Sequence, residues 1–141
     1  ANMLALFFLG PPLEQVLGVL TDYQHYGEVF PYLAEVKGVR EADGSDRLSG
    51  VASSPVLHSW PFDLHLRHSK TATGHVISWD DPGGKLKRNA GHWTLTRVGS
   101  GGTLAAYTLD IQISHYPGFI VRDVLLNRMP AVLTALKQRL G

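Results

Sequence analysis

Four polar side chains of this 141-residue sequence are candidates for a position inside an apolar interior: His68, His92, Tyr107 and Arg128. A histidine, tyrosine or arginine in such a place can polarise a carbonyl group or move a proton beside it. Arg128 falls on the apolar stripe of a segment with helical spacing, so we expect it to face inward; an arginine there can also extend outward past the helix. The four residues indicate either polar contacts to a bound molecule or an acid–base site.

The seven histidines do not have the spacing of a metal site. His65 and His68 are three residues apart in an alternating segment, which places them on opposite faces of a strand. The chain contains no His-Glu-x-x-His pattern, no Gly-x-Ser-x-Gly motif and no cysteine, which excludes thiolate ligands and disulfides. We therefore expect no metal and no cofactor, and we assign no catalytic residue.

The elements that position these side chains begin with a strand at Met3–Leu9, which ends at Gly10-Pro11-Pro12. Apolar residues then recur at three- and four-residue steps, which predicts a short helix to about Asp22. The segment Tyr23–Phe30 continues as a second short helix or turn, which Pro31 closes.

From about Tyr32 to Ser114 the pattern favours strands joined by tight turns. The clearest alternation runs from Thr103 to Ile113 and leaves one face more apolar than the other. Pro55 and Pro61 indicate an edge or bulged position near 58–60. Turns are predicted at Asp43–Asp46, Asp80–Gly84 and Gly99–Gly102.

A long amphipathic helix that starts at Pro117 completes the pattern. We predict an α+β fold in one domain, residues 1–141, with a curved antiparallel sheet of about seven strands. Two short helices follow the first strand, and the long C-terminal helix covers the apolar face of the sheet. The space between sheet and helix is a candidate ligand site, although the same residues can equally form a solid core.

Composition narrows the classes of function. Hydrophobic residues make up 44% of the chain and the net charge is +1, which argues against a nucleic-acid partner. No apolar run approaches the roughly 20 residues of a transmembrane helix, so we expect at most transient membrane contact. A first residue that is not methionine fits a trimmed chain or a cleaved signal peptide. The sequence leaves cytoplasm, periplasm and oligomeric state open.

Three segments resemble a known family. Leu20–Tyr26, continuing to Phe30-Pro31, is similar to the opening signature of the coenzyme Q-binding and polyketide cyclase/dehydrase group of the START-like (SRPBCC) superfamily. Gly91–Leu95 with Gly102–Tyr107 resembles the penultimate hairpin of that group, and the helix that begins at Pro117 fits its last element. The resemblance implies a helix-grip fold with a deep apolar cavity.

In that fold the aromatic corner of Tyr23, Tyr26, Phe30 and Tyr32 lies near one opening of the cavity. These rings either stack on a ligand or cap the core. The side chains that we expect to contact a ligand come from the corner, the sheet and the last helix: Tyr23, Tyr26, Phe30, Leu64, Leu66, His68, Trp93, Leu95, Ala105, Tyr107, Leu109, Val121, Leu125 and Arg128.

The leading hypothesis is a protein that binds and transports a hydrophobic small molecule, such as a lipid, an isoprenoid quinone or a polyketide-like compound, without chemistry. The alternative is a polyketide cyclase or aromatase that acts in the same cavity. An interaction module that binds ribosomes is disfavoured, because the net charge is almost neutral.

Overall fold

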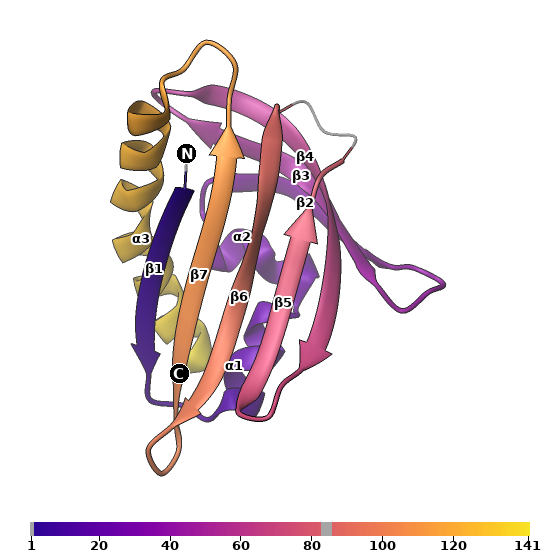
Figure 1. The fold of residues 1–141 in the computed structure, drawn as a ribbon, viewed down its shortest axis with the longest axis vertical. Coiled ribbons are helices and arrows are strands. Elements are labelled where there is room, and N and C mark those ends of the chain that lie inside the picture. The colour runs from indigo at the N-terminus through magenta and orange to yellow at the C-terminus, as the bar shows by residue number, and fades with distance from the viewer. Residues whose placement is uncertain (1, 83–85) are drawn as a thin grey trace.

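A curved antiparallel sheet and one long helix dominate the computed structural model, which describes residues 2–82 and 86–141 (Figure 1). The elements in chain order are β1 (Asn2–Leu9), α1 (Leu13–Leu20), the 3-10 helix η1 (Tyr23–His25), α2 (Tyr26–Val29), β2 (Leu33–Arg40), β3 (Asp46–Ser54), β4 (His58–Lys70), β5 (Gly74–Asp80), β6 (Arg88–Val98), β7 (Gly102–Gln112) and α3 (Gly118–Leu140).

The strands pair in the order β1-β7-β6-β5-β4-β3-β2, with every neighbouring pair antiparallel. β1 and β2 are therefore the two edges, and the short helices that connect them pass from one edge to the other (Figure 1). This arrangement confirms the predicted α+β fold with a seven-stranded curved sheet, short helices after the first strand and a long C-terminal helix.

The alternation in β7 explains which face of the sheet is inside. Ala105, Tyr107, Leu109 and Ile111 are buried, whereas the residues between them are only partly buried. Successive side chains of a strand point to opposite faces, so one apolar residue in two is enough to build the concave wall.

Among the described residues, β4 is paired on both sides only at His65 and Leu66. Its residues His65–Lys70 pair with β5, and among the described residues the segment 58–64 pairs with β3 alone. Pro61 lies in that segment opposite Val51. A proline has no N–H to donate, so it is tolerated where a strand has a free side. The edge position expected near 58–60 is therefore present.

α3 packs its apolar stripe against the inside of the sheet and against the short helices. Val121, Leu125, Met129, Val132 and Leu136 are buried along it. Pro117 precedes the helix in an extended conformation, and its carbonyl accepts hydrogen bonds from Ile120 N and Val121 N. Among the residues that the structure describes, no helix is long and apolar enough to span a membrane.

The structure describes two of the three predicted turns in full and part of the third. Strand β2 ends before the turn at 43–46, where the Asp43 carboxylate accepts hydrogen bonds from Ser45 N and Ser45 Oγ. The turn at 99–102 joins β6 to β7. Of the third, Gly83 and Gly84 lie outside the described residues.

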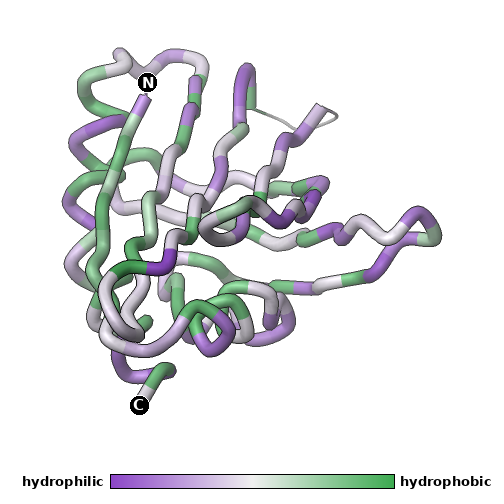
Figure 2. Tube along the Cα trace, turned by 60° about the horizontal axis from the view of Figure 1, so that its bottom comes forward, coloured by the Kyte–Doolittle hydropathy of each residue, from purple (hydrophilic) through white to green (hydrophobic). Residues whose placement is uncertain are grey.

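Figure 2 shows that β1 is hydrophobic along most of its length, consistent with exposed Leu4, Leu6 and Phe8 on its outer face.

Candidate functional site: a pocket between the sheet and the last helix

A pocket lies between the concave face of the sheet and the helical side of the molecule. It encloses about 670 Å³ not occupied by protein atoms, a figure that includes space open to solvent. The lining residues are Tyr26, Phe30, Tyr32, Leu33, Leu48, Ala52, Trp60, Phe62, Leu64, Leu66, Trp79, Asn89, Trp93, Tyr107, Leu109, Ile111, Leu125 and Arg128.

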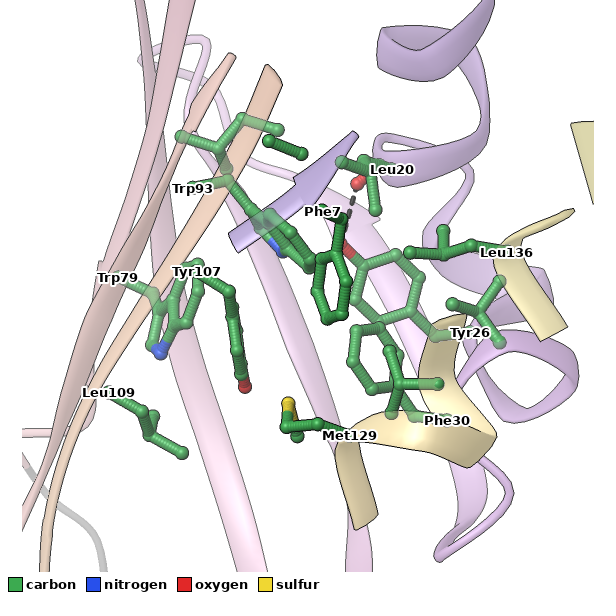
Figure 3. Close-up of a cluster of buried hydrophobic side chains, with 14 of the residues drawn as sticks. Phe7, Leu20, Tyr26, Phe30, Trp79, Trp93, Tyr107, Leu109, Met129 and Leu136 are labelled. Carbon is green, nitrogen blue, oxygen red and sulfur yellow. Dashed lines mark hydrogen bonds between the residues drawn. The ribbon is translucent and has the colours of Figure 1, made fainter. Parts of the chain in front are cut away.

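Aromatic rings from the sheet form the floor of the pocket. Trp93 and Tyr107 are direct partners in the β6–β7 register, and their ring centroids are 4.5 Å apart. The Trp79 ring lies 5.8 Å from Tyr107. Figure 3 shows these rings facing Tyr26 and Phe30 across the interior. Packed rings of this kind give large apolar surfaces with defined geometry.

Gly91 makes room for one of these rings. A Cβ atom at residue 91 would lie 2.8 Å from Trp79 Cζ2 and 2.4 Å from the Thr108 carbonyl oxygen. Real Cβ atoms do not approach so closely, so the indole can lie against the β6 backbone only because residue 91 has no side chain.

The rings on the helical side of the pocket, Tyr26 and Phe30, are held by contacts with the backbone and with each other. The hydroxyl of Tyr26 donates a hydrogen bond of 2.6 Å to the Leu20 carbonyl oxygen, the dashed line in Figure 3. Burial raises the pKa of Tyr26 well above its ordinary value. Phe30 follows 5.1 Å away and reaches within 6.2 Å of Tyr107. Because the Tyr26 hydroxyl has a backbone partner, this residue presents a ring rather than a polar group to the pocket.

The main polar group of the pocket, which we call the Arg128 cluster, consists of Arg128, Tyr32 and Tyr107. The Arg128 guanidinium carbon lies 4.2 Å from the centre of the Tyr32 ring, and the Tyr32 and Tyr107 hydroxyls lie close enough to affect each other's pKa. Arg128 Nη2 also donates to the Ser53 carbonyl oxygen. Arg128 therefore faces inward, as the apolar stripe indicated.

Burial dominates the acid–base behaviour of this cluster. It raises the pKa of Tyr32 to about 12 and that of Tyr107 well above its ordinary value. It lowers the pKa of Arg128 from its ordinary value, an effect that the two tyrosines oppose. Near neutral pH both phenols are protonated and can donate hydrogen bonds, but they are poor bases. The cluster is therefore suited to bind or polarise an oxygen atom.

A second polar group, the Asp46 cluster, comprises Tyr23, Arg40, Asp46 and His68. His68 Nε2 lies 2.9 Å from Asp46 Oδ2 and 3.2 Å from the Tyr23 hydroxyl, and Arg40 Nε donates to Asp46 Oδ1 at 3.2 Å. A carboxylate only accepts, so Nε2 carries the hydrogen that it donates to Asp46. Neither Tyr23 nor His68 lines the pocket.

The structure brings most of the expected contact residues to the pocket and separates the others from it. Those in the lining are Tyr26, Phe30, Leu64, Leu66, Trp93, Tyr107, Leu109, Leu125 and Arg128. Those outside the lining are Tyr23, His68, Leu95, Ala105 and Val121. Leu95 and Ala105 are paired neighbours on the concave face and have no exposed surface. They belong to the closed core at the other end of their strands.

Further residues line the pocket without having been named as contacts. Those from β3 to β6 are Leu48, Ala52, Trp60, Phe62, Trp79 and Asn89, and those elsewhere are Tyr32, Leu33 and Ile111. An alternation of His75, Ile77 and Trp79, all buried in β5, was available in the sequence as a signal. Tyr32 and Leu33 follow Pro31, where no periodicity indicates a direction.

An open groove adjoins the pocket. Its lining includes three serines and a histidine beside the β3–β4 turn: Ser53, Ser54, Ser59 and His58. Tyr32 and Arg128 line both the groove and the pocket. The Arg128 cluster therefore lies at the junction of an apolar interior and a polar surface.

Among residues 2–82 and 86–141, no group of three histidine, cysteine, aspartate or glutamate side chains is placed to hold a metal ion. The polar side chains that line the pocket are those of the Arg128 cluster and Asn89. The arrangement offers hydrogen-bond donors to an oxygen atom within an aromatic enclosure.

Several solved structures share this fold. A START superfamily protein from Mycobacterium smegmatis superposes with a TM-score of 0.81 at 17% identity, covering 99% of this chain and 96% of the other. A STAR-related lipid transfer protein from Xanthomonas axonopodis superposes with a TM-score of 0.82 at 18% identity, covering 99% of this chain and 85% of the other. The ZhuI aromatase/cyclase from a Streptomyces species superposes with a TM-score of 0.78 at 15% identity, covering 99% of this chain and 93% of the other. At such identities the likeness concerns the fold alone.

No curated protein shows a significant sequence match to this chain. A family model does match it: polyketide cyclase / dehydrase and lipid transport, over residues 9–137. That range includes every strand from β2 to β7, the short helices and most of α3. The chain belongs to the polyketide cyclase/dehydrase and lipid transport family.

Proposed function

We propose that the protein binds a hydrophobic small molecule in this pocket and carries it without chemical change. The ligand class comprises lipids, isoprenoid quinones and polycyclic or polyketide-like compounds. One observation carries the proposal: apart from Asn89 and Arg128, every residue that lines the pocket is aliphatic or aromatic. Transfer of apolar surface from water into such an enclosure is favourable by about 25 cal/mol per Å². Since such a ligand is poorly soluble, we also propose transient contact with a membrane during loading.

A direct test starts from protein purified from its own host. Native mass spectrometry and solvent extraction should recover a hydrophobic compound, and the neutral dye Nile red should bind in its place. The sequence contains three tryptophans, Trp60, Trp79 and Trp93, and all of them line the pocket. Quenching of their fluorescence therefore reports directly on occupancy.

A pair of matched variants locates the bound molecule. Ala52 lines the pocket, whereas Ala106 lies on the opposite face of the sheet from Tyr107. Ala52→Phe should fill part of the pocket and weaken Nile red binding by about 10-fold or more, because the added ring displaces ligand volume. Ala106→Phe should leave binding unchanged. Equal binding by both folded variants and the wild type would contradict the proposal.

One observation favours a cyclase as the second candidate. Two phenols and a guanidinium group meet inside the pocket, and such donors can polarise a ketone. A cyclase with aromatase activity would close a ring in a poly-β-ketone by intramolecular aldol addition and then eliminate water, so its product is lighter by the water released. Tyr107→Phe should slow that reaction. A carrier would return the compound unchanged, so mass spectrometry after incubation separates the two.

A further inference from the structure

Arg128 is the cation that faces the pocket, and its neighbours are neutral. Its guanidinium lies over the Tyr32 ring, and Nη2 donates to a backbone carbonyl at Ser53. Among the described residues, no carboxylate lies within ion-pairing distance of Arg128. Other arginines do pair with carboxylates: Arg40, Arg47, Arg88, Arg97 and Arg139. The positive charge of Arg128 is therefore not balanced locally by the described part of the protein.

One end of this guanidinium also lacks an acceptor. Nη1 is buried and has no hydrogen-bond partner among the described residues. Each terminal nitrogen of a guanidinium carries two N–H donors. A buried donor without an acceptor is unfavourable and requires an explanation in a folded protein. At a site that lines both the pocket and the groove, a ligand oxygen is the acceptor that would resolve it.

We propose that Arg128 binds the carboxylate at one end of an otherwise apolar ligand. The preferred ligands are then amphipathic carboxylic acids, an assignment that rests on the proposed function and narrows it. A carboxylate carries one negative charge, so it neutralises one guanidinium and accepts strong, charge-assisted hydrogen bonds from it. A phosphate monoester carries about 1.5–2 negative charges near neutral pH, which leaves charge uncompensated.

The surroundings of Arg128 fit the two ends of such a molecule. Toward the interior lie the rings of Phe30, Trp79 and Tyr107, which suit an apolar body. Toward the groove lie Ser53, Ser54 and Ser59, whose hydroxyl groups suit hydrated oxygen atoms. The Tyr32 ring holds the guanidinium from one face, so the arginine is oriented before the ligand arrives.

The test compares each acid with its own methyl ester. We would titrate palmitate against methyl palmitate, and anthraquinone-2-carboxylate against its methyl ester, and follow tryptophan fluorescence. The wild type should bind each acid about 10-fold or more tightly than its ester, because only the acid pairs with the charge of Arg128. Arg128→Met should abolish this preference and leave the affinity for the esters nearly unchanged.

Arg122→Met is the matched control, since Arg122 is exposed on the same helix. It should retain the full preference, and circular dichroism of both variants should show a folded protein. Equal affinity for acid and ester in the wild type, or a preference that survives Arg128→Met, would overturn the assignment while leaving the proposed function intact. Hexadecyl phosphate binding as tightly as palmitate would overturn the choice of carboxylate. Failure of acids and esters alike would count against the proposed function itself.

Discussion

The Asp46 cluster and the Arg128 cluster differ in whether their charged groups find partners within the protein. Each combines a buried or partly buried tyrosine with an arginine. In the first, Asp46 accepts hydrogen bonds from both Arg40 and His68, and the Arg40 guanidinium supplies the opposite charge. In the second, Arg128 meets an aromatic ring and a backbone carbonyl and keeps one buried nitrogen without a partner. A polar group whose partners lie within the protein stabilises the fold, whereas Arg128, which lacks a partner beside the pocket, is where we propose that a ligand binds.

The largest effect expected from this contrast is on stability at Asp46. Asp46→Ala leaves His68 and Arg40 without their shared acceptor, and Asp46 is only 6% exposed. We expect the free energy of unfolding to fall by about 2–3 kcal/mol, with ligand binding retained. Urea unfolding followed by tryptophan fluorescence measures the loss.

Asp63→Ala provides the comparison for that variant. Asp63 pairs with Arg47 at the surface, with both side chains more than 40% exposed. Exposed pairs contribute less than about 1 kcal/mol. If the two alanine variants lost equal stability, the distinction between a buried carboxylate with two partners and an exposed ion pair would not hold.

A smaller effect should follow from alkaline pH acting on the Arg128 cluster. Burial raises the pKa of Tyr32 to about 12, against an ordinary value of 10.0. Between these pH values the unfolded chain ionises this tyrosine and the folded protein does not. The contribution of the neutral Tyr32 side chain to the free energy of unfolding is therefore complete below pH 10 and is lost as the pH rises toward 12.

Urea unfolding at pH 8 and pH 11 measures this loss. Tyr32 should account for about 1 kcal/mol of the fall in the free energy of unfolding by pH 11. The free energy of unfolding of Tyr32→Phe should therefore fall by about 1 kcal/mol less than that of the wild type. The other tyrosines remain in the variant, so some alkaline loss persists. An identical loss in both proteins would mean that Tyr32 ionises as freely in the folded protein as in the unfolded chain.

The smallest effect should appear at acid pH beside the Asp46 cluster. Burial, together with the charges of His68 and Lys70, lowers the pKa of His75 from its ordinary value of 6.5. The unfolded chain then takes up a proton more readily than the folded protein. The contribution of His75 is present above about pH 6.5 and is lost as the pH falls below it.

Comparing unfolding at pH 7 and pH 5 isolates this term. His75→Gln removes the titrating group, so its stability should fall less between these pH values than that of the wild type, by an amount below the Tyr32 effect. A steeper fall in the variant would show that a charged His75 is favoured by its surroundings.

The fold was accessible from sequence because its main signals are local. Alternation in the segment 103–113 identified β7 and its buried face, and three- and four-residue spacing after Pro117 identified α3. The spacing of apolar residues along an element is enough to predict which of its faces is buried. The β4 edge at Pro61 was accessible for the same reason, because a missing N–H is a local property.

The site was accessible only in part, because its boundaries depend on tertiary contacts. Trp93 and Leu95 lie on the same face of β6, yet only Trp93 lines the pocket. How far a pocket extends along a strand is set by what packs opposite, which alternation does not report. Tyr32 was recognised within the aromatic corner but not as a contact, since it lies outside any periodic element. Trp79 was overlooked although β5 alternates clearly.

Gly91 has a consequence for how this protein tolerates mutation. The Thr108 carbonyl oxygen that a Cβ atom would meet at 2.4 Å belongs to the backbone of the neighbouring strand, so no rotation of a side chain relieves the overlap. Substitution by alanine would have to push β6 and β7 apart and displace the indole of Trp79 together. A screen for loss of function would therefore flag residue 91 as strongly as any binding residue, although glycine has no side chain with which to recognise anything.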